Sequence, residues 1–565
     1  MRALLTETLP LLAGAPNGIK KLRELILELA VRGKLVEQDA SDEPASELLK
    51  QIAAEKARLV AEGKIKKPKL LTEVVEDEIS FSLPSGWTAE RLGVLSHLIT
   101  KGTTPTSIGQ SYASSGIGFV KVENIESRRI SKTAISQYIS LETDELMSRS
   151  RLNSGDVLFS IAGTIGKTCS VHESDLPANT NQALAIIRGT STVFLQDFLL
   201  LQLDSFVSEK TKERARGGAM PNVSLGDLSE LVLVVPPLAE QRRIVAKVDE
   251  LMALCDRLEA QQADAESVHA QLVQALLGSL TQASDADEFA ANWQRLAEHF
   301  HTLFTTEPSI DALKQTLLQL AVMGKLVPQD PSDESADKLL KRISDHRSTY
   351  REKKQKSLAD ISEVEKPFEL PCQWAWATLP AIGELARGKS RHRPRNDPSL
   401  YAGGNVPLIQ TGDVARANGV VKTHSAMYNA KGVEQSRLWS AGTMCITIAA
   451  NIADSATLGF DACFPDSVVG FIPEFPELNV RYFEFFLRTA KSHLEDFAPS
   501  TAQKNINLEI LGLLSVPLPP ANEVRRIVAK VDQLMALCDQ LKTRLTQARQ
   551  LNEQLASTLV EQAVA

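Results

Sequence analysis

The sequence predicts an internally duplicated α+β protein, with two α/β domains separated by two long antiparallel coiled-coil helices and with additional helical repeat regions. Three observations predict this fold. The stretch Arg242–Asp256 recurs at Arg525–Asp539 with fourteen of fifteen residues unchanged, and residues 29–36 recur less exactly at 320–327. The two intervals that follow the shorter repeats contain short β-type runs broken by Gly, Asn and Asp. Fourteen identities in a chain of 565 residues do not arise by chance, so we conclude that the chain is duplicated.

Residues 1–78 are predicted to form a helical region, and residues 284–366 to form its repeat. Gly33 and Gly324 stand where the first helix of each region should end. The leucine-rich start of the chain, around Leu12, has some features of a signal peptide, but a similar stretch recurs around Leu303. A cleaved leader has no reason to recur in mid-chain, so we expect a helix of the mature protein there.

Residues 79–237 and 367–520 are predicted to be two α/β domains of one ancestry. Their shared features are an opening Leu-Pro-x-x-Trp motif (83–87, 370–374), β-type runs (118–122, 156–161, 406–409, 443–448) and a late helix-like stretch (193–210, 479–495). The two domains differ far more from each other than the helical repeats do. The helical regions and long helices together form a frame that is similar in the two halves, which indicates two identical partners. The two α/β domains are dissimilar, which indicates two different targets.

The long helices are predicted at residues 238–283 and 521–565, and each follows a pair of prolines. Their apolar residues recur at alternating spacings of four and three, as in the seam of a coiled coil. The seam residues are Ile244, Val248, Leu251, Cys255 and Leu258 in the first copy, and Ile527, Val531, Leu534, Cys538 and Leu541 in the second. Each seam could pack on its own domain, or the two copies could pack on each other. We favour mutual packing, and two near-identical helices related by a twofold axis across them must run antiparallel.

Composition excludes several classes of protein. No apolar run approaches the roughly 18 residues of a membrane span. The six cysteines include no Cys-x-x-Cys pair, so we expect a reduced, cytoplasmic protein without a metal site. The net charge of −8 argues weakly against a nucleic-acid binder, but residues 80–235 and 366–520 carry only −1 and 0. A phosphate-facing surface in either domain must therefore arise by segregation of charge.

The segment Gly163–Thr168 resembles a phosphate-binding loop, because it follows a predicted strand and ends in Gly-Lys-Thr. A phosphate loop needs four residues between its glycines, and only two separate Gly163 from Gly166. The residues that follow do not read as a helix, so we interpret the segment as a tight turn. Elsewhere no set of residues forms a nucleophile, a general base or a metal site, which favours a non-catalytic protein.

The most informative polar run is the Arg- and Lys-rich segment 387–395. It contains no acids, so it concentrates positive potential where DNA phosphates or guanine edges could be contacted, although a solvated loop is the alternative. The matching segment of the first domain is 101–106, whose hydroxyls can donate to phosphate oxygens. Residues just after a strand, such as Asn124, could read base edges or close a turn. The candidate DNA-binding residues are Lys101, Thr103, Thr104, Lys121, Asn124, Lys210, Lys212, Arg214, Arg216, Asn222, Arg387, Lys389, Arg391, Arg393, Arg395, Gln410, Gln503, Lys504 and Asn505.

The whole arrangement resembles the specificity (S) subunit of type I restriction–modification systems, of the larger kind with an extended N-terminal helical region. The resemblance is carried by the run Pro236–Val245, by its altered copy that begins at Pro519, by the Leu-Pro-x-x-Trp openings and by Ser154–Leu158. The second domain departs from the pattern, because Ala441-Gly442-Thr443 replaces the Ser-Gly-Asp of the first domain. Base contacts therefore do not transfer to it position by position.

The resemblance implies a non-catalytic subunit of a DNA adenine methyltransferase and restriction endonuclease complex. Two target-recognition domains would each read one half of a bipartite site in double-stranded DNA. The helices would set the spacing of the half-sites and dock two copies of a methyltransferase (M) subunit, and an ATP-driven restriction (R) subunit would be recruited. S-adenosylmethionine, ATP and Mg²⁺ would be bound by these partners, with no cofactor on this chain and no membrane involved. The alternative is a coiled-coil scaffold whose two divergent domains bind proteins rather than DNA.

Overall fold

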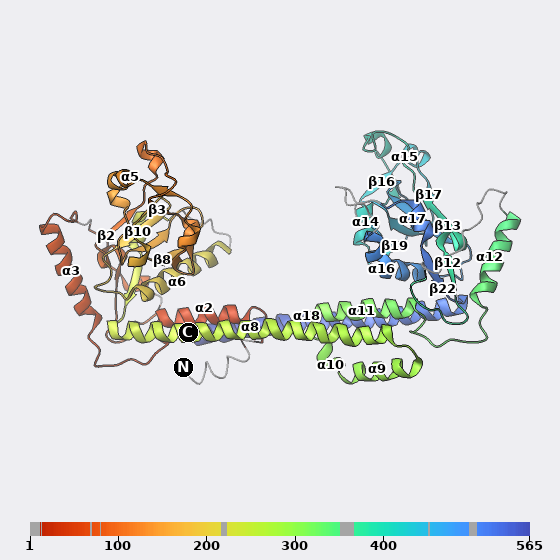
Figure 1. Cartoon of the computed structure of the whole chain (residues 1–565), viewed down its shortest axis with the longest axis horizontal. Helices are drawn as coiled ribbons and strands as arrows, with labels where there is room; N and C mark the ends of the chain where they lie inside the picture. The colour runs from red at the N-terminus through yellow and green to blue at the C-terminus, as the bar shows by residue number, and fades with distance from the viewer. Residues whose placement is uncertain are drawn as a thin grey trace. The chain divides into compact units, whose positions relative to one another are not determined.

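The structure, a computed structural model, describes residues 12, 14–67, 70–79, 81–215, 223–350, 366–449, 452–496 and 506–564. The chain divides into two compact units, of which one comprises Met1–Asp264 with Arg549–Ala565 and the other comprises Ala265–Ala548. Each unit contains one helical region, one α/β domain and part of each long helix (Figure 1).

The two helical regions repeat one another, as the sequence predicts. In the first unit the region consists of α2 (Gly18–Val31) and α3 (Ala45–Ala61), and in the second it consists of α11 (Glu307–Val322) and α12 (Ala336–Tyr350). Gly33 and Gly324 adopt φ angles of 67° and 72° just after α2 and α11, which confirms the expected helix ends. The second unit also contains α9 (Ala286–Glu298) and α10 (Phe300–Leu303). Most of the N-terminal stretch expected to be helical lies outside the described residues.

The first domain is built on a four-stranded antiparallel sheet. Its strand order is β2 (Leu98–Lys101), β10 (Leu184–Arg188), β7 (Val157–Ser160) and β8 (Thr168–Ser170). A second sheet contains β6 (Tyr138–Ile139), β3 (Ile117–Val120) and β9 (Ala178–Thr180). The pair β1 (Thr88–Arg91) and β11 (Val232–Val235) joins the two ends of the domain. The domain also contains α4 (Leu92–Leu95), β4 (Ile125–Glu126), β5 (Arg129–Ile130), α5 (Leu141–Leu146), the longer helix α6 (Gln196–Ala215) and α7 (Leu225–Glu230).

The second domain repeats this plan with larger sheets. Its five-stranded sheet has the order β13 (Gly383–Arg387), β21 (Val468–Pro473), β18 (Met444–Thr447), β19 (Ser455–Leu458) and β15 (Val420–Val421). Its four-stranded sheet has the order β16 (Ala426–Tyr428), β14 (Val406–Leu408), β20 (Ala462–Cys463) and β17 (Leu438–Trp439). The ends are joined by β12 (Ala375–Thr378) and β22 (Ser515–Leu518). The domain also contains α13 (Leu379–Ile382), α14 (Thr411–Arg416), α15 (Ala430–Glu434), the longer helix α16 (Val480–Asp496) and α17 (Leu508–Leu513).

The long helices are α8 (Leu238–Gln282) and α18 (Ala521–Val564), within a residue of the expected bounds. The start of α8 belongs to the first unit and its end to the second, whereas α18 begins in the second unit and ends in the first. The two helices therefore run antiparallel, in agreement with the prediction.

The packing of the seams differs from the arrangement that we favoured. The seam of the first copy is packed in a core with α2 and the first domain, and with Ala556, Val560 and Ala563 near the end of α18. In the second copy, Ile527 and Val531 join the core of the second domain. Further along α18, Leu534, Cys538 and Leu541 pack with α9 to α11 and with Val273, Leu277 and Leu280 near the end of α8.

The near-identical segments therefore do not pack on each other. In an antiparallel pair, the start of one helix meets the end of the other, and each duplicated start also packs on its own helical region and domain. Packing on its own domain and packing on the other long helix were the two interpretations of each seam, and both were partly right. Each seam contacts its own domain and also the other long helix. Among the described helices, none is long and apolar enough to cross a membrane.

Candidate nucleic-acid interface

Each domain is attached to its frame by a buried polar joint. In the first unit, Glu240 near the start of α8 is buried, and its two carboxylate oxygens accept hydrogen bonds from Gln38 Nε2 at 2.6 Å and Trp87 Nε1 at 2.9 Å. Arg243 and Asp42 form an ion pair of 2.6 Å beside it. Burial raises the pKa of Glu240, and the two hydrogen bonds partly offset this rise. The joint connects the helical region, the opening of the domain and the long helix.

The second unit repeats the joint almost atom for atom. Glu523 accepts from Gln329 Nε2 at 2.7 Å and from Trp374 Nε1 at 3.0 Å, and burial again raises its pKa. Arg526 and Asp333 form the accompanying ion pair of 2.7 Å. Sequence reasoning missed both glutamates as partners of the tryptophans, although Glu240 and Glu523 each stand three residues after the proline pairs that we identified.

The loops expected to face DNA follow matching strands of the two domains. β2 ends at Lys101 and β13 ends at Arg387, and both side chains are exposed. The next residues are Gly102 and Gly388, whose amides donate to Leu184 O and Val468 O at 3.1 and 2.9 Å. A side chain at either glycine would overlap backbone carbonyls, so only glycine fits. The structure thus aligns segment 101–106 with the start of segment 387–395, as the sequence predicts.

In the first domain, this loop is neutral beyond Lys101. Thr103 and Thr104 are half-buried, and Thr104 Oγ1 donates a hydrogen bond to Gln182 Oε1 in the loop that precedes β10. Lys121 forms an ion pair of 3.7 Å with Glu123, and its amine lies 5.7 Å from the ring centre of Tyr112. The loop after β2 and its surroundings therefore carry little positive charge.

In the second domain, the five cations of segment 387–395 have different roles. Arg393 Nη1 donates to the carbonyls of Ser390 and His392, at 2.6 and 2.8 Å, so this side chain holds its own loop together. Arg395 Nη2 donates to both carboxylate oxygens of Asp466, at 2.7 and 2.8 Å. Arg387, Lys389 and Arg391 are exposed, and no side-chain partner is found for them among the described residues. The expectation of a run without compensating acids is wrong at Arg395, because Asp466 reaches it from a distant loop.

Two candidates expected just after a strand differ in the structure. Asn124 is 3% exposed, accepts from the Lys121 amide at 2.8 Å and donates to Ala134 O at 2.7 Å, so it closes a turn. The structure therefore contradicts a base contact for Asn124. Gln410 is exposed, and its backbone amide donates to Asp413. Its side chain remains available as a candidate.

The remaining candidates are not placed. Lys210, Lys212 and Arg214 belong to the end of α6, but their side chains lie outside the described part of the structure. Arg216, Asn222, Gln503, Lys504 and Asn505 lie outside the described residues altogether. The segment that resembled a phosphate loop is a turn between β7 and β8, where Gly163 and Gly166 have φ angles of 75° and 90°. The interpretation of a tight turn is confirmed.

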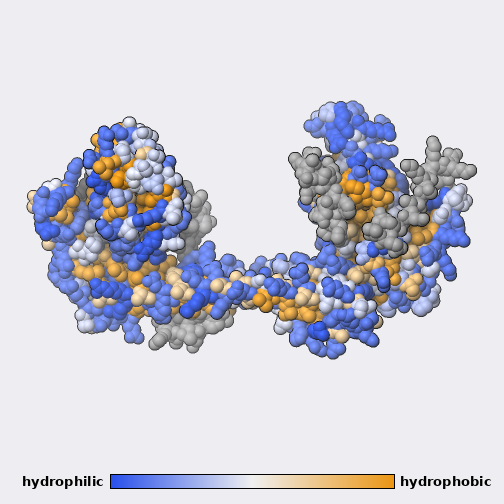
Figure 2. Space-filling view, in the orientation of Figure 1, coloured by the Kyte–Doolittle hydropathy of each residue, from blue (hydrophilic) through white to orange (hydrophobic). Residues whose placement is uncertain are grey.

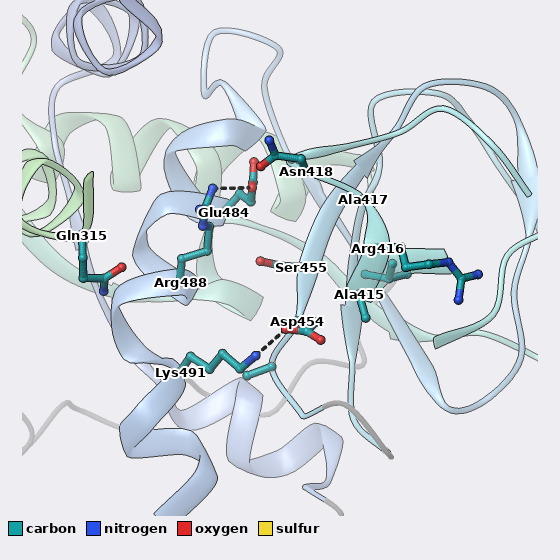
Figure 3. A pocket seen from close by; sticks show the side chains of 13 residues that line it. Gln315, Ala415, Arg416, Ala417, Asn418, Asp454, Ser455, Glu484, Arg488 and Lys491 are labelled. Atoms are coloured by element: carbon teal, nitrogen blue, oxygen red, sulfur yellow. Dashed lines mark hydrogen bonds and ion pairs between the residues drawn. The ribbon is translucent and has the colours of Figure 1, made fainter. Parts of the chain in front are cut away.

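A polar cavity of about 370 Å³ lies in the second domain beside α16 (Figure 3). Glu484 lines it and is fully buried, yet neither of its carboxylate oxygens has a hydrogen-bond partner among the described residues. Arg488 and Arg481 lie 3.7 and 3.9 Å away, and Lys491 pairs with Asp454 at the same cavity. Burial raises the pKa of Glu484 to about 7, although the two arginines act in the opposite direction.

At the corresponding place, the described polar groups of the first domain are hydrogen-bonded. There Thr168, which matches Ser455 in strand register, donates to Asp204 at 2.9 Å, and Asp204 pairs with Arg128 at 2.6 Å. The equivalent Ser455 hydroxyl is buried without a partner among the described residues. The two domains have thus diverged in their buried polar groups as well as at their surfaces.

The sequence matches the type I restriction modification DNA specificity domain at residues 84–266 and 375–549, together more than half of the chain. Two relatives from Escherichia coli, the type I restriction enzyme EcoAI and EcoEI specificity subunits, are each 34% identical over 97% of this chain and 94% of their own length. The HsdS subunit from Thermoanaerobacter tengcongensis is 20% identical with a TM-score of 0.44, over 86% of this chain and 98% of that one.

The helical frame is duplicated, and it attaches its two domains by matching joints at Glu240 and Glu523. The two domains themselves have diverged. These features define a class of protein that presents two recognition surfaces on one scaffold. The family matches and the two relatives give that class its name. This chain belongs to the type I restriction–modification DNA specificity family.

Proposed function

We propose that the chain is the specificity subunit of a type I restriction–modification complex, in which each domain reads one half of a bipartite site in double-stranded DNA. One observation carries this proposal. The joints at Glu240 and Glu523 repeat one another within about 0.1 Å in their hydrogen bonds, whereas the loops after β2 and β13 share only their first cation and glycine. Recognition of two different half-sites requires a conserved helical frame and loops after β2 and β13 that differ between the two domains.

We further propose that the long helices dock two copies of a methyltransferase subunit. Two pairs of large apolar side chains are exposed on them: Val268 and Leu272 on α8, at 64% and 51%, and Leu551 and Leu555 on α18, at 66% and 47%. Both pairs begin twenty-six residues after the repeated arginine, Arg242 or Arg525, so they occupy equivalent positions of the duplication. Residues four apart share one helix face, so each pair offers a partner helix an apolar stripe. Equivalent stripes fit two identical partners.

Docking is tested with the variants Val268→Asp/Leu272→Asp and Leu551→Asp/Leu555→Asp, each coexpressed with the methyltransferase subunit. Each double variant should lose one of the two partner copies, because a carboxylate cannot be buried unpaired at an apolar contact. The mass of the purified complex, by light scattering, measures the loss. Leu537→Asp is the control, because Leu537 is also exposed on α18 at 53% but lies outside the stripes. Retention of both copies by both double variants would contradict the proposal.

Half-site reading is tested by mapping methylated adenines in DNA exposed to the reconstituted complex. We expect one bipartite motif, and replacement of residues 375–518 by the corresponding segment of a related subunit should change one half of it only. The scaffold alternative predicts instead no retention of labelled duplex by the complex. In our proposal the partners bind S-adenosylmethionine, ATP and Mg²⁺ in the cytoplasm, and a restriction subunit joins them. Calorimetry on the purified chain should then show no stoichiometric binding of S-adenosylmethionine or ATP, and either ligand binding would contradict this part.

A further inference from the structure

We infer that the Arg395–Asp466 pair of the second domain reads the edge of a guanine–cytosine base pair, and that it does not contact DNA phosphate. This inference rests on the proposed function, because it assigns a chemical role within the half-site that the second domain reads. The sequence alone left open which of the five cations in segment 387–395 face bases and which face phosphates.

The loop that carries Arg395 is held by several hydrogen bonds, which suits base reading. Gln435 Oε1 accepts from the amides of Arg391 and His392, at 2.7 and 3.1 Å. Tyr401 Oη donates to the carbonyl of Arg395 itself at 2.6 Å. His392 Nε2 lies 2.7 Å from Asp397 Oδ2. A loop fixed at this many points loses little conformational entropy when it binds, so its side chains can discriminate between bases.

The loop also lies near the outer tip of the second domain. Ser436, which follows α15, donates from its hydroxyl to Lys389 O at 2.8 Å, so the loop packs beside that end of α15. Within the second unit, α15 lies at the end of the domain farthest from α11 and α18 (Figure 1). The surface over this tip is hydrophilic (Figure 2).

The guanidinium group of Arg395 is both oriented and available. It contacts Asp466 through Nη2 alone, and no described residue accepts from Nε or Nη1, so their hydrogens remain for a ligand. The side chain is 49% exposed. The carboxylate therefore sets the direction of a planar group that still has donors to offer, and a free guanidinium N–H can donate to the O6 or N7 acceptor of guanine.

Charge distinguishes a base contact from a phosphate contact. A phosphate bound at Arg395 would lie close to the Asp466 carboxylate and be repelled by it, and Asp466 already neutralises the arginine. A guanine–cytosine pair presents two acceptors, N7 and O6, followed by the N4 amino donor of cytosine. An arginine beside an aspartate presents donors followed by an acceptor, which is the complementary pattern. Arg387, Lys389 and Arg391, which have no acidic partner among the described residues, are suited to phosphate.

The first domain offers a matched comparison. Gly102 and Gly388 bond to Leu184 and Val468, so Gln182 and Asp466, each two residues before these, occupy equivalent positions. The partner of Gln182 is Thr104, and this pair is neutral where the second domain has an arginine and an aspartate. Gln182 and Asp466 therefore make the same kind of contact between two loops, but the hydrogen-bonding groups that each pair presents are different. This is expected of a residue pair that sets specificity.

The test uses the complete complex with Arg395→Lys, Arg395→Ala and Asp466→Asn, and maps methylation over a library of randomised sites. We expect each variant to lose preference for guanine at one position of one half-site, by about 5- to 150-fold, with the other half-site strict. Asp466→Asn retains the shape of the pair and should affect the same position. Thermal unfolding of each variant establishes that the domain is folded.

Two outcomes would overturn the inference. A uniform loss across all sequences, with the salt slope reduced by about one, would assign Arg395 to phosphate. An unchanged motif in all three variants would make the pair structural. Failure of the proposed function is distinct from both, because the parent complex itself would then show no sequence-specific methylation.

Discussion

At the residue scale, the joints show why the same glutamate recurs in both copies of the duplication. A buried carboxylate is costly unless its oxygens accept hydrogen bonds, and Glu240 and Glu523 each accept from an indole and an amide. The donors come from the domain opening and from the loop after the first helix of the region. The joint therefore holds three chain segments together at one point.

We predict that Glu240→Ala and Glu523→Ala each lower the free energy of unfolding by about 1–3 kcal/mol, because Trp and Gln donors are left without an acceptor. Chemical denaturation of the whole chain measures the loss. Glu240→Gln and Glu523→Gln are the controls, since an amide oxygen can still accept from the indole and its nitrogen can donate to the glutamine. Equal losses for the Ala and Gln variants would show that the hydrogen bonds do not matter.

Glu484 predicts a dependence of stability on pH. Its pKa is about 7 in the folded chain and has an ordinary value of 4.5, so the folded state binds the proton more tightly. The stabilisation that the folded state gains from protonated Glu484 is fully present below pH 4.5 and is lost as the pH rises to 7. Each unit of difference between the folded and unfolded pKa corresponds to about 1.4 kcal/mol of this stabilisation. We therefore expect Glu484→Gln to be more stable than the parent at pH 8 and similar to it at pH 4.

Urea denaturation of parent and variant at several pH values measures this difference. The variant should lack the decline between pH 4.5 and 7, because glutamine does not titrate. Parallel curves of stability against pH for the two proteins would mean that groups other than Arg481 and Arg488 stabilise the Glu484 carboxylate in solution.

At the scale of elements, the period of the long helices predicted a buried seam, but not what would cover it. A spacing of four and three shows which face of a helix is apolar, and several neighbours can cover such a face. Here the helical regions supply one neighbour, since α2 and α11 pack on the starts of α8 and α18. Each seam is therefore part of a core of three or more elements rather than of a two-helix coiled coil.

We predict that Leu277→Ala, at a side chain that is 3% exposed, destabilises the packing of α8 on α18 and α11 by about 2–5 kcal/mol. Hydrogen exchange should accelerate at residues 534–545 and in α11, whose apolar side chains share its core, and remain unchanged in α2. Faster exchange at residues 244–258 instead would support direct packing of the two duplicated segments.

At the scale of the whole molecule, the chain passes between the two units only within the long helices, after Asp264 in α8 and after Ala548 in α18. Leu258 and Leu541, at the ends of the two seams, pack against the cores of the first and the second unit, so an insertion directly after either would disturb that core. The boundaries of the units are therefore better places to lengthen the long helices.

We predict that seven residues inserted after Asp264, together with seven after Ala548, widen the gap between the half-sites. A heptad preserves the register of the apolar face and adds about 10 Å of helix. This corresponds to roughly three base pairs at about 3.4 Å each, fewer if the DNA twists to compensate. Methylation mapping should show a longer gap between unchanged half-sites. An active variant with the original gap would contradict the proposed spacing role.

The sequence by itself determined the duplication, the order of elements, the antiparallel helices and the family. These conclusions depend on local signals, namely repeated motifs, glycines at helix ends, prolines before helices and the spacing of apolar residues. The interpretation of Gly163–Thr168 as a turn was confirmed for the same reason, because glycine spacing is a local property.

Only the tertiary structure decided which distant groups meet. Asp466 reaches Arg395 across 71 residues, and Glu240 reaches Trp87 across 153, so neither pairing leaves a signal in the neighbouring sequence. The same holds for Asn124, whose amide proved to be held by backbone groups, and for the seams, whose partners come from helices elsewhere in the chain. Pairing depends on how the sheets and helices place side chains in space, and this placement distinguishes an arginine that can read a base from one that holds its own loop.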